Sequence, residues 1–417
     1  MLRTAIPLFP FLIGCLLVSG CGPASQPVWN TDSRSFFYTH TDGSVLQYDL
    51  DKDATRVLLP PGEQQPCQLA LSPTLPFVAC AQSALGPEGR AVQVGLASLV
   101  DGSMSWSNLE VWGDAKARRD VSAASCYWCP TGQRILIWYQ QAGDVPGLIQ
   151  SATPFGQFAV YDIKSRKLSE LTTAPPAVIL GQAIHASPLC PDGSGYLAMK
   201  LADQGPKFFF VSWDGWEYPL ALAEEVVAIL NLIGDTNAPN ETRTRTFFPL
   251  PQGVWKENVL KFPTRSGAIA IDLKNRKITL EALTAAQQQE FDQMAEADTA
   301  DAPWTTIQVV PFQKGEYALH CRQKIGSSSA RVELVDNKAR RRRILLEGSL
   351  PENFLIHYLF PSPDGQLILV SLRDSQTKSS WIHVVQPDGK IQAKVDTGPV
   401  VAGGTHQTVS LFSTSRM

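Results

Sequence analysis

The chain has 417 residues, of which 44% are hydrophobic, and its formal net charge is −3. This length and composition are typical of a globular protein with room for two or three ordinary domains or one large repeat array. A chain this close to neutral has no overall field that would steer it to nucleic acid, so we expect no nucleic-acid partner. Thirty glycines and thirty prolines are spread along the chain, which is typical of many short strands joined by turns.

Residues 1–20 have the features of a secretory signal. Arg3 is followed by an apolar run from Ile6 to Val18, then by small residues and a cysteine. The apolar run is too short to span a bilayer. Its end, Leu17-Val18-Ser19-Gly20-Cys21, resembles the bacterial lipobox. The alternatives are an ordinary cleaved signal with a chance cysteine, and a competing lipobox that ends at Cys15 after a very short apolar run.

The lipobox resemblance implies a lipid anchor. In lipoproteins of this kind the chain is cut before the cysteine, here Cys21, which then carries a diacylglycerol on sulfur and a further fatty acid, such as palmitate, on its amine. Several acyl chains together give stable membrane attachment. Gly22, which is not aspartate, favours the outer membrane by resemblance to enterobacterial sorting, with the protein facing the periplasm or the cell exterior.

The mature chain reads as a short tether at residues 21–30 and a single domain at residues 31–417. In this domain a hydrophobic segment is repeatedly followed by a turn of the form Ser/Cys-Pro-Asp/Thr-Gly. These turns begin at Cys129, Cys190 and Ser362, and an incomplete copy begins at Ser72. Proline presets φ at the first central position of such a turn, and glycine supplies the positive φ that follows. A later strand of each unit ends at an aspartate, and these aspartates are spaced 52 to 64 residues apart: Asp49, Asp101, Asp162, Asp214, Asp272, Asp336 and Asp388.

A period of this length predicts an array of like β-units. Most units contain four short segments rich in β-branched and aromatic residues, without helical crossovers. The hydrophobic strand, the Ser-Pro-Asp-Gly turn and strand ends such as Tyr48-Asp49 and Tyr161-Asp162 resemble the TolB-like and WD-repeat-like propeller families. We therefore expect an all-β fold: a β-propeller of about seven four-stranded blades, with six or eight as alternatives, and one or two short helical insertions.

Some expectations depend on particular segments. We expect first strands at Ile184–Leu189 and Arg245–Leu250, one continuous strand at Val254–Phe262, and a long loop at Gln82–Arg90. The first of the predicted β-units lacks a clear first strand. We therefore predict that Gln407–Ser413 supplies this strand and closes the ring.

The cysteines suggest structural roles. Cys126 and Cys129 match C-x-x-C, but residues three apart in a strand point to opposite faces, and Cys129 occupies the same turn position as Cys190. We therefore interpret these three residues as structural and predict no metal site. Cys67 and Cys80 flank one predicted hairpin and could form a disulfide, which an oxidising compartment permits.

The long segments between predicted strands fall on one face of the expected ring, which usually marks the binding face of a repeat protein. Ala223–Ile233 and Thr284–Ala297 look helical, and the second begins with Thr284 and Gln287 at capping-box spacing. Both helices could pack on the ring as lids, or one could bind a partner. The predicted binding surface comprises Val145, Leu148, Ile149, Phe155, Phe291 and Met294.

No catalytic motif was found. The chain contains no G-x-S-x-G, H-E-x-x-H, Walker or dinucleotide-binding sequence, and we expect no cofactor. Asp49–Asp53 resembles the start of a calcium loop but has Ala54 and Pro60 where glycine and glutamate are required, so we interpret it as a polar turn. Lys338–Arg343 holds five basic residues in six, which suits a solvated edge, lipid headgroups or an acidic partner.

These observations predict a membrane-anchored, monomeric lipoprotein that acts without catalysis, as a binding or scaffold protein in the bacterial envelope. Its partner would be a protein or an envelope polymer. The alternative is a propeller enzyme of the glycoside hydrolase, lyase or lactonase type, with carboxylates at the central channel, because such acids come from separate blades and leave no local motif.

Overall fold

The structure is a computed structural model of the whole chain. It describes residues 27–60, 68–86, 89–108, 121–141, 157–170, 178–179, 189–202, 205–227, 253–264, 266–301, 304–324, 329–346, 354–374 and 379–399. Within these residues the fold is all-β, as predicted, with strands in every part of the chain and one long helix.

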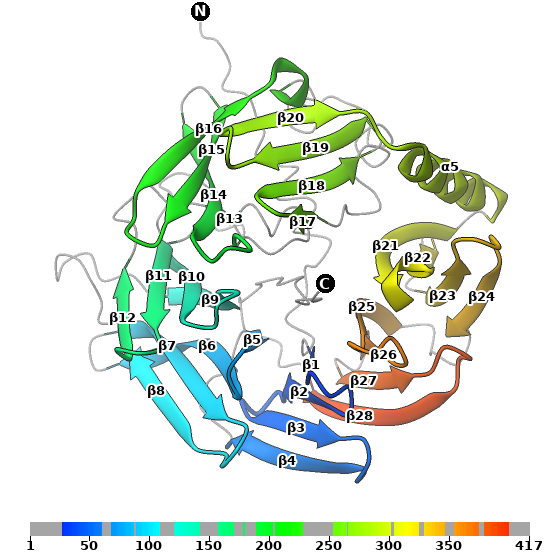
Figure 1. Ribbon diagram of the computed structural model, residues 1–417. Helices are drawn as coiled ribbons and strands as arrows, with labels where there is room; N and C mark the ends of the chain where they lie inside the picture. Colours follow the sequence, from blue (N-terminus) through cyan, green and yellow to red (C-terminus); the bar gives the residue numbers. More distant parts are fainter. Residues whose placement is uncertain are drawn as a thin grey trace, which may run out of the picture.

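The described strands form seven antiparallel units of four, each connected in simple up-and-down order. Five units are separate sheets. The other two are joined into one eight-stranded sheet by a short parallel pairing of β16 with β20, through Ala221–Lys277 and Leu222–Ile278. Figure 1 shows the units arranged around a common centre, with the first strands toward the centre and the last strands outside.

The first four units, which we call sheets one to four, follow the chain from residue 28 to residue 222. Their strands are β1 (Val28–Trp29), β2 (Ser35–Thr39), β3 (Val45–Asp49) and β4 (Ala54–Leu59); β5 (Gln68–Leu71), β6 (Phe77–Gly86), β7 (Gly89–Ser98) and β8 (Met104–Asn108); β9 (Val121–Trp128), β10 (Arg134–Gln141), β11 (Gln157–Asp162) and β12 (Lys167–Glu170); β13 (Val178–Ile179), β14 (Gly195–Ala202), β15 (Gly205–Ser212) and β16 (Glu217–Leu222).

The last three units, sheets five to seven, contain the remaining strands, the helix α5 and a short 3-10 turn, η2. They are β17 (Val254–Lys256), β18 (Val259–Thr264), β19 (Gly267–Asp272) and β20 (Lys277–Glu281), followed by α5 (Ala285–Ala300); β21 (Trp304–Phe312), η2 (Gln313–Gly315), β22 (Tyr317–Lys324), β23 (Ala330–Asp336) and β24 (Arg342–Leu346); β25 (Phe354–Pro361), β26 (Ile368–Asp374), β27 (Ser379–Val385) and β28 (Ile391–Pro399).

Two strand predictions were wrong. The segment Val254–Phe262 is a hairpin, because Glu257 takes a positive φ of 52° and reverses the chain between β17 and β18 without a glycine or proline signal. Of the predicted strand Ile184–Leu189, only Leu189 is described, where it forms a bridge to Tyr196, and the described first strand of sheet four is β13. Most of Gln82–Arg90 continues the strands β6 and β7 instead of forming a loop. The predicted strand Arg245–Leu250 lies outside the described residues.

The Pro-Asp/Thr-Gly turns have the predicted geometry and also connect neighbouring sheets. In each complete copy the glycine N–H donates to the carbonyl at the start of the turn, and the glycines Gly132, Gly193 and Gly365 have φ near 70°. Thr74 Oγ1 donates to Thr131 O in the next sheet, and Gln313 Nε2 donates to Gly365 O. A β-carbon on Gly132 would lie 1.9 Å from Thr74 Oγ1, so this contact needs glycine.

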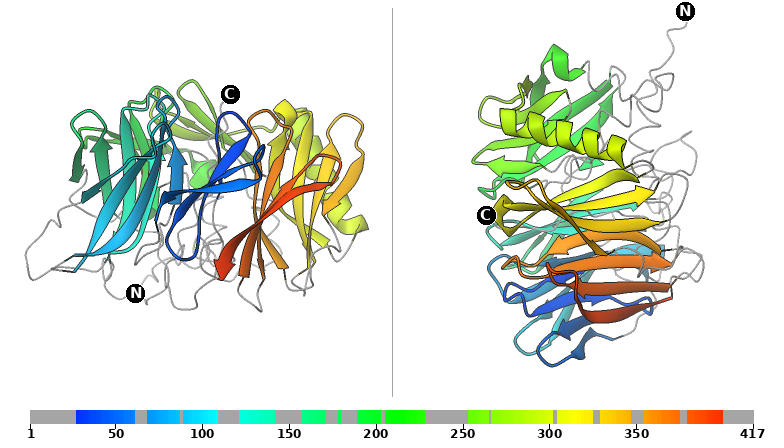
Figure 2. Two further views of the ribbon diagram at one scale, coloured as in Figure 1. Left: turned by 90° about the horizontal axis from the view of Figure 1, so that it is seen from below. Right: turned by 90° about the vertical axis from the view of Figure 1, so that its right-hand side faces the viewer.

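The turns between third and fourth strands lie on the same side as these first turns. The residue after the third strand donates its N–H to a carbonyl of the first turn, as in Leu50 to Arg34 at 2.9 Å and Leu99 to Pro76 at 2.8 Å. The same bond occurs in the third, fifth and sixth sheets. Hydrogen bonds therefore connect the two kinds of short turn on this side of the molecule, which we call the short-turn face; Figure 2 shows the sheets from the side.

The first and last sheets are joined by packing. Trp29 of β1 donates its indole N–H to Phe360 O of β25 at 2.8 Å, and Thr41 N donates to Thr397 O. Phe36 and Tyr38 from the first sheet share one buried cluster with residues of the last. The predicted closing strand Gln407–Ser413 lies outside the described residues, and the edge of β2 that it was expected to fill is occupied by β1.

Candidate functional site

Most of the predicted site residues lie outside the described part of the chain. This is true of Cys21 and Cys67 and of the loop residues Val145, Leu148, Ile149 and Phe155, so the anchor, the disulfide and most of the binding surface stay predictions. Cys80 is buried on β6. Phe291 is half-buried on α5, the helix that also contains Met294.

The helix α5 begins with the predicted capping box. Thr284 Oγ1 accepts the N–H of Gln287 at 3.2 Å, and the Gln287 side chain accepts the N–H of Thr284 at 3.0 Å. This reciprocal pair satisfies two of the backbone donors that a helix start leaves open. The helix lies at the periphery between β20 and β21 (Figure 1) and is followed directly by Asp301.

The junction that α5 bridges, between the fifth and sixth sheets, differs from the other six. Within the described residues, apolar clusters join sheets one and two, two and three, three and four, four and five, six and seven, and seven and one. No such cluster of described residues joins sheets five and six. The sixth sheet instead presents polar side chains on the face away from its apolar cluster with sheet seven: His320, Arg322, Arg331 and Glu333.

Arg322 is at the centre of this charge cluster and is fully buried. Its Nη1 donates to Asp301 Oδ2 at 2.8 Å and lies 3.4 Å from Glu333 Oε1, and its Nη2 donates to Trp304 O at 3.1 Å. Asp301 thus ties the end of α5 to the middle of β22. Both carboxylates contact the same guanidinium nitrogen of Arg322, and its positive charge offsets the repulsion between them.

Arg331 makes the second connection. Its guanidinium pairs with Asp301, its Nε lies 2.6 Å from Glu333 Oε1, and its carbon lies 4.3 Å from the Trp304 ring centroid. The remaining oxygen of Glu333 faces Arg342 Nη1 at 3.5 Å. Among the described residues, three arginines therefore contact these two carboxylates.

The neighbouring His320 is affected by this charge. Burial, and then the charges of Arg342 and Arg322, lower its pKa to about 3, so it is neutral at physiological pH. Its Nδ1 has no hydrogen-bond partner among the described residues. Burial opposes ionisation of Asp301, but hydrogen bonds and charge from Arg331 and Arg322 hold the pKa of this carboxyl below its usual value.

This arrangement stabilises the junction and does not suit acid–base catalysis. A general acid needs a carboxyl with a raised pKa, whereas the pKa of Asp301 is lowered here. Removing one partner of such a buried set leaves an uncompensated charge, which costs several kcal/mol. Within the described residues, no group of three or more His, Cys, Asp or Glu side chains is placed to hold a metal ion.

The C-x-x-C pair is structural in the described residues. Cys126 packs in the cluster between the second and third sheets, and Cys129 packs in the cluster between the third and fourth. The two residues therefore face opposite sides of one sheet, as predicted. The Cys129 sulfur contacts Thr131 Oγ1 at 3.3 Å and Gly193 O at 3.8 Å, which is a turn-to-turn contact.

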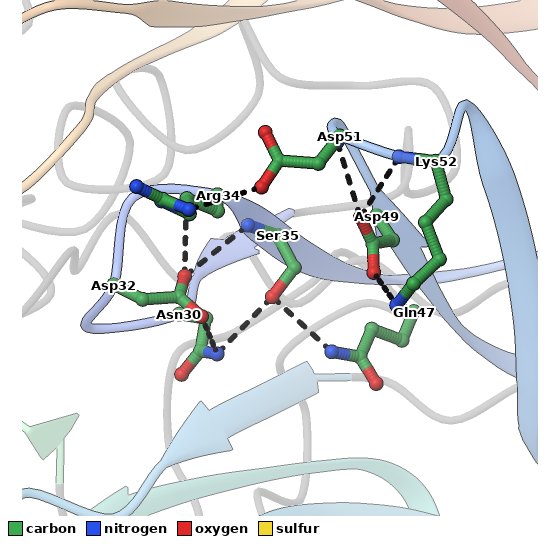
Figure 3. Close-up of polar contacts among 8 residues, drawn as sticks. All are labelled: Asn30, Asp32, Arg34, Ser35, Gln47, Asp49, Asp51 and Lys52. Carbon is green, nitrogen blue, oxygen red and sulfur yellow. Dashed lines mark hydrogen bonds and ion pairs between the residues drawn. The ribbon is translucent and has the colours of Figure 1, made fainter.

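The recurring aspartates shape turns. Asp49 Oδ1 accepts the N–H groups of Asp51 and Lys52 at 3.1 Å each, and Lys52 Nζ lies 2.6 Å from Asp49 Oδ2. The Lys52 ammonium holds the pKa of Asp49 below its usual value. The segment resembling a calcium loop is thus a polar turn bonded to its own sheet, and Figure 3 shows the network: Asn30, Asp32, Arg34, Ser35, Gln47, Asp49, Asp51 and Lys52.

The same turn recurs in three other sheets. Asp162, Asp272 and Asp336 each accept backbone N–H groups two or three residues later. The residue four positions after each aspartate takes a positive φ of 49° to 56°: Asp53, Arg166, Arg276 and Arg340. These recurring aspartates therefore stabilise the local turns that reverse the chain on the short-turn face.

Sequence reasoning missed the charge cluster. The signal was present, because charged residues stand at alternate positions inside two predicted strands, at His320 and Arg322 and at Arg331 and Glu333. In an ordinary edge strand this alternation faces solvent. The strand register places Arg331 opposite Arg322 and Glu333 opposite His320. This pairing brings the four side chains together on one buried face of the sheet.

Comparison with known proteins does not identify a family. No family model and no curated protein matches the chain. A solved structure of a prolyl endopeptidase matches with 12% identity and a TM-score of 0.47, and the Pyrococcus horikoshii acylaminoacyl peptidase matches with 10% identity and a TM-score of 0.39. The matches cover 93% and 86% of this chain but span about half, 52%, of each of those chains. Among the described residues, no helix has the length and apolar character needed to cross a membrane.

Proposed function

We propose that this chain is a lipid-anchored β-propeller of the bacterial envelope that acts by binding, without catalysis. Seven four-stranded units around one centre, with the first and last packed together, support a seven-bladed ring. The lipobox ending at Cys21 supports the anchor.

The observation that carries the proposal is where the chain enters the ring. Val28 pairs with Phe37 and Trp29 with Phe36, so β1 runs toward the turn at residues 30–34 on the short-turn face. Pro27, the first described residue, therefore lies toward the opposite face, and the tether from Cys21 would join the ring there. The predicted long connections are on that same face, so anchor and binding surface would share one side of the molecule. The short-turn face is bonded to itself and points away from the membrane.

The partner would then be a membrane protein or an envelope polymer close to the bilayer, reached by a monomeric ring. The test is affinity capture of the full, lipidated chain from detergent-solubilised cells after chemical cross-linking in the intact envelope. A single partner that is recovered with the native chain, and lost when residues 145–149 are replaced by a Gly-Ser segment, is the expected result. Failure to recover a stable partner would argue against a binding function.

The enzyme alternative makes a different prediction. A glycoside hydrolase needs two carboxyl groups near the central channel, one with a raised pKa. Asp301, which is half-exposed at the end of the peripheral helix α5, and Glu333, which is buried on β23, are both engaged by arginines. Turnover of a glycoside, polysaccharide or lactone substrate by the purified chain, abolished by substitution of a carboxylate lining the channel, would replace the binding proposal with the enzyme.

A further inference from the structure

The sixth sheet carries a charge opposite to that of the rest of the protein. Residues 304–346 contain nine lysines and arginines and three acidic residues, which is a net charge of +6. Because the whole chain carries −3, the other residues together carry −9. Such a local reversal concentrates positive potential at one place on an acidic molecule.

The charge is concentrated at one corner of the sheet. Residues 337–344 are all exposed, at the turn between β23 and β24 and at the start of β24. Asp336 shapes this turn by accepting the N–H groups of Lys338 and Ala339. Arg342 reaches back to Glu333, whereas Lys338, Arg340, Arg341 and Arg343 have no acidic partner among the described residues. We call these four residues with Arg342 the basic corner.

A basic residue on an outer strand has an ordinary purpose, which is to prevent edge-to-edge association of sheets. The other outer strands meet that need with little charge, since β4 and β28 contain one basic residue each and β8 contains none. β24 is also the outer strand of its sheet, and it exposes Ile344 beside its arginines, with 46% of that residue accessible. Apolar surface next to guanidinium groups is typical of a protein interface more than of a solvated edge.

We propose that the basic corner is the docking surface for an acidic, extended segment of a protein partner, which lies along the outer edge of β24. Guanidinium groups bind carboxylates with directional, charge-assisted hydrogen bonds. The outer strand offers backbone groups to an added strand, and Ile344 offers an apolar contact between the charges. Arginine is the residue type expected for such recognition, and four of the five basic residues are arginine.

The position of the basic corner relative to the membrane anchor favours a protein partner over the membrane, and this step rests on the proposed function. The tether starts at the face opposite the turns, so the basic corner is one strand length from the anchored side. Even a five-residue strand such as β2 spans roughly 17 Å, about twice the Debye length of roughly 8 Å in physiological salt. The charge of the anchoring bilayer is therefore largely screened at the basic corner.

The test uses the full-length Cys21→Ser chain, which cannot be acylated at that position, in buffer without detergent, and two probes: a fluorescein-labelled peptide of alternating glutamate and valine, and vesicles of phosphatidylglycerol and phosphatidylethanolamine. We expect the peptide to bind with an affinity that falls as salt is raised. Charge reversal of Arg341 and Arg343 to glutamate should weaken it about ten-fold, mainly through the association rate. A matched control reverses Lys164 and Lys167, which are exposed at the equivalent turn of the third sheet, and should change the affinity less than about two-fold.

The outcomes are distinct. Peptide binding that is absent, or that is equally sensitive to both pairs of substitutions, overturns the proposal. Vesicle binding that is lost with the Arg341 and Arg343 pair, in the absence of peptide binding, assigns the basic corner to a lipid surface and also overturns it. Lipidation does not enter either measurement, so a chain that is never acylated at Cys21 would refute the anchor and leave this result standing.

Discussion

The packing of the first sheet on the last predicts that Trp29 is essential to the stability of the ring. Its indole is 7% exposed, donates to Phe360 O at 2.8 Å and meets the Phe36 ring edge-on at a centroid distance of 5.8 Å. Trp29→Ala removes a large buried side chain and should cost about 3–5 kcal/mol of unfolding free energy. Trp29→Phe keeps most of the packing, loses the hydrogen bond, and should cost about 1–2 kcal/mol.

Urea unfolding followed by circular dichroism measures both effects. The matched control is Trp216→Ala, because Trp216 is 70% exposed at the turn between β15 and β16, where a truncation should change stability by less than about 0.5 kcal/mol. If Trp29→Ala shifts the unfolding midpoint no more than the control does, the first and last sheets are not joined through this residue. Deleting residues 405–417 tests the predicted closing strand separately, and a sharp loss of stability would show that it closes the ring together with β1.

Three further predictions concern the charge cluster and the turns. Glu333→Gln should destabilise the protein by about 3–5 kcal/mol in urea unfolding, because Arg322 stays buried and loses the negative charge of Glu333. The pKa of His320 is 6.5 in the unfolded chain and about 3 in the folded one, so the unfolded chain binds a proton first as the pH falls. The free energy of unfolding should therefore be highest above pH 6.5 and decrease as the pH falls toward 3. His320→Gln should therefore flatten the loss of stability between these values, measured as the urea midpoint against pH. Gly132→Ala should lower the midpoint more than Gly315→Ala, because both glycines have a positive φ but no atom lies within 4 Å of a β-carbon on Gly315.

Each of these predictions has an internal check. Glu281→Gln removes an exposed carboxylate that pairs with Lys261 at 2.6 Å, and should cost less than about 1 kcal/mol. Equal effects of the two glutamate substitutions would mean that the charge cluster is solvated. An unchanged pH profile in His320→Gln would show that the histidine is not desolvated in the folded state. Equal effects of the two glycine substitutions would show that the turn-to-turn contact is absent.

The parts of the fold that follow from local chemistry could be predicted from the sequence. Pro-Asp-Gly turns set φ within a few residues, which phases the strands, and the Thr284 capping box marks the start of α5. The hairpin at Glu257 was missed because a glutamate has to adopt a positive φ there, and neighbouring contacts impose this without a local signal.

The candidate site was harder to predict because it depends on which residues meet across strands. Arg322 and Glu333 are ordinary strand residues until the register places them on one buried face beside Asp301. The aspartate repeat indicated the period of the β-units. The positive φ four residues after Asp49, Asp162, Asp272 and Asp336 shows that each of these aspartates serves its own turn.

The most direct test of the account is lipid attachment at Cys21. Cells that express the native chain or Cys21→Ser are grown with a labelled fatty acid, and the purified proteins are examined by fluorography and by mass spectrometry of the N-terminal peptide. We expect a labelled chain that begins at an acylated Cys21, and an unlabelled variant that is released from the membrane fraction. A native chain that carries no acyl group, or label that persists in the variant, would contradict it.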